Sequence, residues 1–161
     1  MARESAFSLL GLPARFSLSD EEIEGAWRER IALVHPDRFA AAGDAAKRVA
    51  EQWATRLNDA KRELTDPVTR AKALLAINGV DLAEQTDTRM PKDFLMRQFT
   101  WRERAQGGQK DAVLAELKGA LSQCLTAITE ALDEKKDFLR ARELTRELLF
   151  LDKLAHDLAS A

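Results

Sequence analysis

The residues of this chain best suited to chemistry form one short run, His35-Pro36-Asp37, between two stretches with helical character. An imidazole and a carboxylate two positions apart can exchange protons, bind a cation or hydrogen bond to another protein. Proline lacks a backbone N–H and disfavours helical angles at the preceding residue, so a helix running up through Val34 should end at or just before His35. The run is therefore predicted to be a rigid loop that presents polar groups from a helical scaffold.

Other groups that could support catalysis or metal binding are few and scattered. His156 is expected on the surface of a charged C-terminal helix, and together with His35 and Asp37 it lacks a ligand spacing such as His-x-x-x-His. Cys124 is the only cysteine, so a single chain cannot build a disulfide or a thiolate metal site. We therefore expect no enzyme activity, no metal and no cofactor. A small helical hydrolase that uses His35 and Asp37 is the disfavoured alternative.

The composition is that of a helical protein that can bury a core: 45% of the 161 residues are hydrophobic and 32% are charged. The 25 basic and 27 acidic side chains leave a net charge of −2, so no global field favours nucleic acid or an anionic membrane. Residues 1–5 carry an early acid and do not resemble a secretory signal or a transit peptide. No apolar run approaches the roughly 18 residues that span a bilayer. We expect a cytoplasmic protein.

Two long helices are predicted to carry the His-Pro-Asp loop at their junction. The first begins at a capping box, in which Ser19 caps the helix and Glu22 returns the bond. The second runs from about residue 45 to 64, and in an antiparallel pair the two apolar stripes would face each other. These stripes comprise Ile23, Trp27, Ile31 and Val34 in the first helix and Val49, Trp53, Leu57, Ala60 and Leu64 in the second.

The remaining elements are also predicted to be helical, which makes the fold class all-α. A short helix over residues 6–12 precedes the pair, and Asp66-Pro67 opens another helix that runs to about Ile77. Residues 80–90 lack helical periodicity and are predicted to be a linker. Beyond it, apolar spacing predicts three helices with short connections, which favours an antiparallel bundle. Their expected ranges are residues 91–104, a segment of some five turns through 114–132, and residues 137–158.

Residues 24–39 with their flanking helices resemble the J domain of DnaJ-type co-chaperones, whose signature is a His-Pro-Asp loop between two antiparallel helices. Further segments narrow this resemblance to the HscB family of iron–sulfur co-chaperones: residues 7–16, Asn58, Pro67 with Arg70, residues 94–96 and residues 150–154. The similarity covers nearly the whole chain. It implies an L-shaped, two-domain protein with a J domain at 1–79, a linker at 80–90 and a three-helix scaffold-binding domain at 91–161.

The resemblance implies that the N-terminal domain binds a DnaK- or HscA-type chaperone and stimulates its ATPase. Arg28, Arg30 and Arg38 are the candidate basic patch beside the loop, and the alternative is an ordinary solvated helix face. Asn58 is expected either to brace the loop or to touch the partner. The expected ATPase-binding residues are His35, Pro36, Asp37, Arg28, Arg30, Arg38 and Asn58.

The resemblance also implies that the C-terminal domain binds an IscU-type iron–sulfur scaffold protein. Leu95, Met96 and Phe99 share one side of a predicted helix, where periodicity alone favours core packing and the resemblance favours an exposed apolar patch. Thr100 and Gly107 stand where the family often has acids, so apolar burial should supply more of the affinity here. The expected scaffold-binding residues are Leu95, Met96, Phe99, Glu103 and Phe150.

The expected function is therefore that of a co-chaperone that stimulates a dedicated ATPase and delivers the scaffold protein to it during iron–sulfur cluster assembly. Two alternatives remain besides the hydrolase. One is a J-domain adaptor for a different client protein. The other is a structural interaction protein in which the His-Pro-Asp run is incidental and affects no ATPase.

Overall fold

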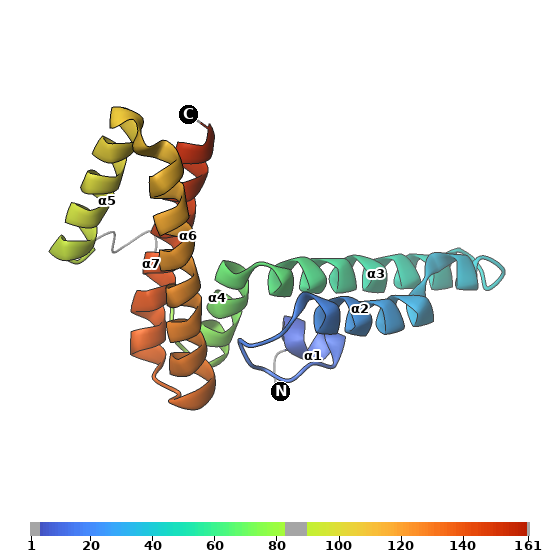
Figure 1. The fold of residues 1–161 in the computed structure, drawn as a ribbon. Helices are drawn as coiled ribbons and strands as arrows, with labels where there is room; N and C mark the ends of the chain where they lie inside the picture. Colours follow the sequence, from blue (N-terminus) through green and yellow to red (C-terminus); the bar gives the residue numbers. More distant parts are fainter. Residues whose placement is uncertain (1–3, 83–89, 161) are drawn as a thin grey trace. The chain divides into compact units, whose positions relative to one another are not determined.

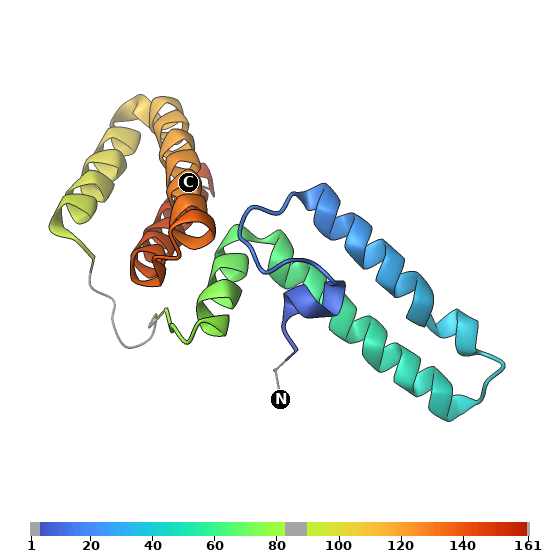
Figure 2. The ribbon, with the colours of Figure 1, turned by 90° about the horizontal axis from the view of Figure 1, so that it is seen from below.

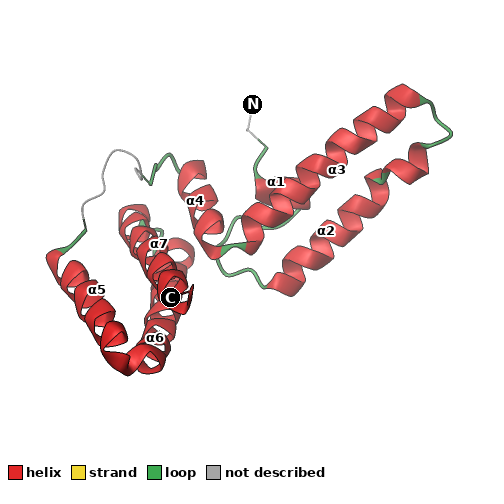
Figure 3. Ribbon diagram, turned by 90° about the horizontal axis from the view of Figure 1, so that it is seen from above, coloured by secondary structure: helices red, strands yellow, loops and turns green. Residues whose placement is uncertain are grey.

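The computed structural model describes residues 4–82 and 90–160, and every regular element in these two ranges is helical. The chain divides between Ile77 and Asn78 into two compact units. The predicted all-α class is confirmed, with helices shown throughout the described chain in Figure 3. Most of the predicted linker, residues 83–89, lies outside the described residues, as do the first three residues and the last. Leu82, within the predicted linker, is buried.

The N-terminal unit consists of a helical hairpin with one short helix packed against it and one helix continuing from it (Figures 1 and 2). The two long helices run antiparallel side by side, and the first short helix contacts mainly the second of them. The elements are α1 (Ala6–Leu10), α2 (Asp20–Val34), the 3₁₀ turn η1 (Pro36–Phe39), α3 (Asp44–Thr65) and α4 (Pro67–Ile77).

The helix ends follow the local signals in the sequence. Ser19 Oγ accepts the Glu22 backbone N–H at 3.1 Å, and the Ser19 N–H donates to the Glu22 carboxylate at 2.8 Å, which confirms the predicted capping box. Helix α1 ends at Gly11, whose φ of 67° lies in the left-handed region that glycine tolerates. Asp66 accepts the Val68 N–H at 3.2 Å and opens α4.

The apolar seam on α3 matches the predicted stripe at Leu57, Ala60 and Leu64 and departs from it only in the first half of the helix. Ala50 is buried, whereas Val49 is 52% exposed and Trp53 is 37% exposed. The prediction that Val49 and Trp53 face the first helix is therefore wrong. The side chains of neighbouring helical residues point in directions about 100° apart. Ala50 can therefore face the seam while the larger Val49 side chain points into solvent. The buried α3 residues are Ala50, Leu57, Ala60 and Leu64.

The C-terminal unit is a bundle of three helices. It comprises α5 (Lys92–Arg104), the turn η2 (Ala105–Gln109), α6 (Lys110–Thr129), the π turn η3 (Glu130–Glu134) and α7 (Phe138–Ser160). Between α5 and α6 the chain turns at Gly108, whose φ is 93°. The most extensive packing joins α6 and α7, through fully or nearly fully buried side chains that include Val113, Leu117, Ile128, Ala141 and Leu154. None of the described helices combines the length and apolar character that crossing a bilayer needs.

Candidate functional site

The His-Pro-Asp run forms an exposed tip on the hairpin. Helix α2 ends at Val34 as predicted, but the run continues into the 3₁₀ turn η1 rather than a plain loop. Proline at the first position suits the start of a helical turn because its φ is already fixed. The Asp37 backbone N–H donates to His35 Nδ1 at 3.2 Å, and the Asp37 carboxylate lies 3.6 Å from the same nitrogen. The side chains remain 53% exposed for His35 and 92% for Asp37.

This hydrogen bond defines what the tip can offer a partner. Because Nδ1 accepts the Asp37 N–H, the neutral His35 ring carries its proton on Nε2 and can donate there. The Asp37 carboxylate is an exposed acceptor. Arg38 secures the base of the turn, since its backbone N–H donates to the His35 carbonyl at 3.0 Å and its guanidinium donates to the Ala32 carbonyl at 3.0 Å. The tip therefore presents a donor and an anionic acceptor on a locally bonded backbone.

The two helices that carry the tip are tied together by a polar cluster midway along their length. The Trp27 indole N–H donates to Asn58 Oδ1 at 2.9 Å, and the Lys61 ammonium lies 4.0 Å from the centre of the Trp27 ring. Lys61 also pairs with Glu24 at 2.6 Å. This bond, with desolvation opposing it and Arg28 assisting, holds the pKa of Glu24 below its usual range. Asn58 thus joins the helices to each other, rather than bracing the tip itself.

The three predicted arginines do not gather into one patch. Arg28 pairs with Glu24 at 3.1 Å, whereas the Arg30 guanidinium covers Gly11, at the end of α1. Residues two apart on a helix point to different faces. Arg38 lies at the tip, but its guanidinium caps the end of α2. Of the predicted ATPase-binding residues, the structure therefore brings together His35, Pro36, Asp37 and Arg38, and places Arg28, Arg30 and Asn58 elsewhere on the hairpin.

The second candidate surface is the outward side of α5. Phe94 and Trp101 turn inward and are buried, whereas Leu95, Met96 and Phe99 are 49%, 58% and 59% exposed. The core alternative is therefore wrong for these three side chains. Glu103, one turn beyond Phe99, is also exposed. We call Leu95, Met96, Phe99 and Glu103 the α5 face.

Phe150 is set apart from the α5 face. It lies half-buried on α7 and forms a T-shaped pair with the inward Phe94, with the ring centres 6.3 Å apart. Phe150 therefore supports α5 through Phe94, and only part of its ring is accessible. The structure brings together four of the five predicted scaffold-binding residues on one helix and places the fifth on its supporting helix.

A polar cluster that sequence reasoning missed attaches α5 to α6. Glu116 Oε2 accepts the Trp101 indole N–H at 2.9 Å and an Arg104 N–H at 2.7 Å. The Arg104 bond, followed by the Trp101 bond, lowers the pKa of Glu116 below its usual range despite some desolvation. Arg104 also donates to Gln109 at 2.9 Å in the connecting turn. Sequence spacing gives no signal for this cluster because its residues lie on different elements.

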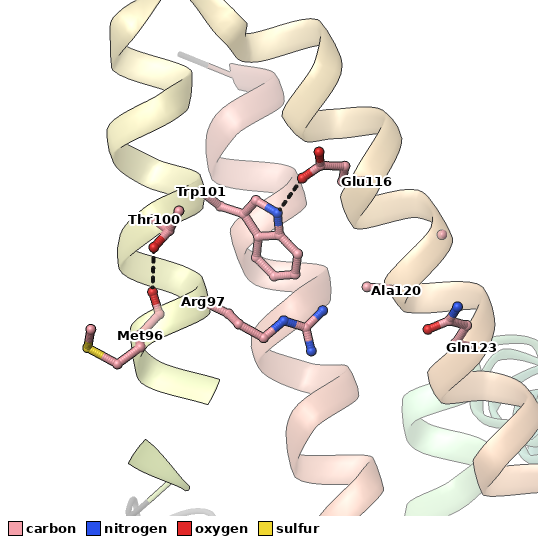
Figure 4. Close-up of a pocket in the computed structure, with 8 residues that line it drawn as sticks. Met96, Arg97, Thr100, Trp101, Glu116, Ala120 and Gln123 are labelled. Atoms are coloured by element: carbon pink, nitrogen blue, oxygen red, sulfur yellow. Dashed lines mark hydrogen bonds between the residues drawn. The ribbon is translucent and has the colours of Figure 1, made fainter. Parts of the chain in front are cut away.

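Beside this cluster, α5 and α6 enclose an open groove of about 530 Å³ (Figure 4). Met96, Thr100 and Trp101 line it from α5, and Gly119 and Ala120 line it from α6. Arg97 extends from α5 toward the groove, with its guanidinium 4.7 Å from the centre of the Trp101 ring. The groove adjoins the α5 face because Met96 belongs to both.

The remaining candidates show no catalytic arrangement. His156 occupies an exposed position of α7, in the unit that does not contain His35 and Asp37. Burial raises the pKa of the Cys124 thiol to about 12, and the thiol donates to the Leu144 carbonyl at 3.3 Å, so it stays protonated at neutral pH. Within residues 4–82 and 90–160, no group of three or more His, Cys, Asp or Glu side chains is placed to hold a metal ion.

Comparison with known proteins assigns this chain to a family. The chain is 44% identical over its whole length to a co-chaperone protein HscB homolog of Bordetella parapertussis, of which it covers 98%. This chain belongs to the HscB family of co-chaperones. A co-chaperone protein HscB homolog of Burkholderia mallei is 42% identical, over 98% of this chain and 94% of the relative. The predicted family membership is thus confirmed.

Family and structural comparisons agree with this HscB assignment. The family model described as the HSCB C-terminal oligomerisation domain matches residues 90–159. The chaperone HscB from Vibrio cholerae has a similar structure, with a TM-score of 0.81, 27% identity, and 98% and 96% of the two chains covered. Human co-chaperone protein HscB shares the fold at a TM-score of 0.89, over 99% of this chain and 83% of the human one. The N-terminal unit is accordingly a J domain and the C-terminal unit an HscB helical bundle.

The HscB assignment sets the class of function. The protein is a co-chaperone, and a co-chaperone acts on a chaperone partner. Its relatives are named for this role and not for an enzyme activity.

Proposed function

We propose that the tip of the J domain binds a DnaK- or HscA-type chaperone and stimulates its ATPase. The single observation that carries the proposal is the exposed His35-Pro36-Asp37 turn at the end of the hairpin, with its donor and acceptor groups accessible. The protein itself hydrolyses nothing in this scheme. It stabilises the state of the chaperone that is competent for hydrolysis, which is a population shift produced by differential binding.

The chemistry of the tip supports a specific contact of this kind. The Asp37 carboxylate can accept a charge-assisted bond from an arginine of the chaperone, worth about 1.5–3 kcal/mol. His35 Nε2 can donate a second bond. Pro36 and the bonds at Arg38 order the turn before the encounter, so less conformational entropy is lost on binding.

The α5 face is proposed to bind an IscU-type scaffold protein that carries a nascent iron–sulfur cluster. Its three exposed apolar side chains form a patch of the type that anchors protein interfaces. The scaffold and its cluster are cargo in this scheme, so this chain needs no metal ligands of its own. Binding of the scaffold by one unit and of the chaperone by the other raises their effective concentration and couples hydrolysis to capture of the correct client.

The test is a pair of substitutions at the tip, assayed with the cognate chaperone. His35→Gln should abolish stimulation, because glutamine cannot reproduce the ring that accepts the Asp37 N–H and donates at Nε2. Asp37→Asn should lower stimulation strongly, because the amide keeps the shape of the side chain and removes its charge. Circular dichroism should show native helix content for both variants, since both side chains are exposed. Normal stimulation by a folded His35→Gln protein would refute the role of the tip.

The choice of client is tested separately by titrating the scaffold protein into the co-chaperone. Binding that depends on the α5 face supports the iron–sulfur role. Absence of scaffold binding, with ATPase stimulation intact, would instead indicate a J-domain adaptor for another client.

A further inference from the structure

The groove between α5 and α6 carries a positive charge that the fold does not neutralise. Arg97 is exposed and forms no ion pair with any residue in the described ranges 4–82 and 90–160. Other arginines of α5 are paired: Arg102 lies 3.8 Å from Asp157, and Arg104 binds Glu116. Arg97 therefore differs from its neighbours in having its charge available.

Neither of the two carboxylates near Arg97, those of Glu116 and Glu147, forms an ion pair with its guanidinium. Glu116 instead accepts bonds from Trp101 and Arg104, both at its Oε2 atom. Glu147, on α7, has its pKa raised by burial, and the fields of Arg140 and Arg97 only oppose that rise. Arg97 thus acts on Glu147 at a distance and not through an ion pair.

The position of the Arg97 side chain is nevertheless defined. Its guanidinium carbon lies over the Trp101 ring, 4.7 Å from the ring centre, and Trp101 is itself fixed by burial and by its bond to Glu116 (Figure 4). A cation–π contact uses none of the guanidinium N–H donors as hydrogen bonds to oxygen, so these donors can bind a carboxylate. Gly119, across the groove, leaves open space, because a Cβ there would meet no atom within 4 Å.

We propose that Arg97 binds a carboxylate of the protein that docks on the α5 face, so that this partner presents an acidic side chain next to its apolar contact residues. The inference rests on the proposed function, since it concerns the partner of the same surface, and it adds the sign of the one partner charge that lies opposite Arg97. Met96 joins the two parts of the site: it is exposed on the α5 face and also lines the groove. Apolar burial supplies affinity there, and Arg97 supplies orientation and selectivity.

The test is a titration of the scaffold protein into the full-length co-chaperone at two salt concentrations. Arg97→Met keeps an aliphatic chain on Trp101 and removes the charge, Arg97→Lys keeps the charge, and Arg97→Glu reverses it. Lys118→Gln is the matched control, because Lys118 is exposed on α6 but does not line the groove. We expect binding to weaken about 3- to 10-fold for Arg97→Met and further for Arg97→Glu, as for an interface charge pair at the rim. Arg97→Lys should fall between Arg97→Met and wild type, and Lys118→Gln should match wild type.

The salt dependence of binding shows whether a loss of scaffold affinity comes from the charge of Arg97. Higher ionic strength should weaken binding of the wild type more than binding of Arg97→Met, because the wild type has one more charge pair for the salt to screen. Unchanged or tighter binding by Arg97→Met and Arg97→Glu, with the wild type still binding the scaffold, would overturn the inference alone. Failure of the wild type to bind the scaffold would overturn the scaffold role and this inference with it.

Discussion

The α6–α7 pair and the α2–α3 pair are both helix pairs, yet apolar burial contributes much more to the first than to the second. Helix α7 buries eight of its 23 residues, whereas α2 buries only Ile23 of its 15. The α2–α3 pair adds to its smaller apolar seam a cluster of polar contacts at Trp27, Lys61 and Asn58. An apolar seam supplies stability, whereas the polar cluster fixes the register of two helices whose outer ends stay exposed.

Helix α5 resembles α2 in this respect. It buries only Phe94 and Trp101, and its attachment to α6 passes through the polar cluster at Glu116. The helices that carry the two proposed binding surfaces are therefore those with the smallest apolar seams. A helix that must offer side chains to a partner cannot bury them within its own unit, and directional bonds then hold it in place.

The largest effect is expected in the α6–α7 seam. Leu117→Ala removes a side chain with no exposed area and should lower the free energy of unfolding by about 2–5 kcal/mol. The matched control is Leu139→Ala on α7, where the side chain is 69% exposed and the change should stay within about 0.5 kcal/mol. Urea unfolding followed by circular dichroism measures both. Equal losses for the two variants would remove the distinction between seam and surface.

The second-largest effect is expected on the affinity for the scaffold protein and not on the stability of the fold. Met96→Ala combined with Phe99→Ala should weaken scaffold binding by roughly 2 kcal/mol or more, because both exposed side chains lose their apolar contact with the partner. Calorimetric titration measures the affinity, and Leu139→Ala serves as an exposed apolar control outside the α5 face. An unchanged affinity in the double variant would show that the α5 face does not bind the scaffold.

A smaller effect is expected at the polar cluster of the hairpin. Trp27→Phe keeps a ring under Lys61 and removes the indole N–H that Asn58 accepts. Because water can reach the exposed Asn58 amide, the free energy of unfolding should fall by only about 0.5–1.5 kcal/mol. A double-mutant cycle with Asn58→Ala checks that the loss comes from this bond. Strictly additive losses in that cycle would show that the bond does not join the helices.

The smallest effect is a pH dependence at Glu24. Its pKa is lowered by Lys61, so its contribution to stability is present above the ordinary value of 4.5 and is lost as the pH falls through the lowered pKa. The stability difference between wild type and Glu24→Gln should therefore shrink as the pH falls below 4.5. Glu29→Gln, at an exposed position of the same helix, is the control. A difference that stays constant or grows in acid would contradict the role of the Lys61 ion pair.

The sequence predicted the helices and the exposed tip because these depend on local signals. The Ser19–Glu22 capping box and the proline at position 36 each act within a few residues, whereas the exposure of the α5 face was expected only from the family resemblance. The spacing of apolar residues was a less reliable guide on α3, where Ala50 faces the seam and Val49 does not. Such spacing locates the buried face of a helix only to within one residue.

Contacts between helices were not predictable in the same way. The roles of Glu116, Arg30 and Asn58 depend on which helix lies opposite and how far it extends. No spacing within one helix records that information. The core alternative for the α5 face was resolved only by side-chain exposure, because an outward and an inward apolar stripe have the same period.

The claim that the protein works through two separate surfaces is tested most directly by a single-turnover ATPase assay of the cognate chaperone, with and without scaffold protein. Wild type should stimulate hydrolysis alone and more strongly with scaffold. His35→Gln should give no stimulation in either condition but still bind scaffold. The Met96→Ala, Phe99→Ala variant should stimulate normally alone and lose the additional effect of scaffold. Loss of scaffold binding in His35→Gln, or loss of basal stimulation in the α5 variant, would contradict the account.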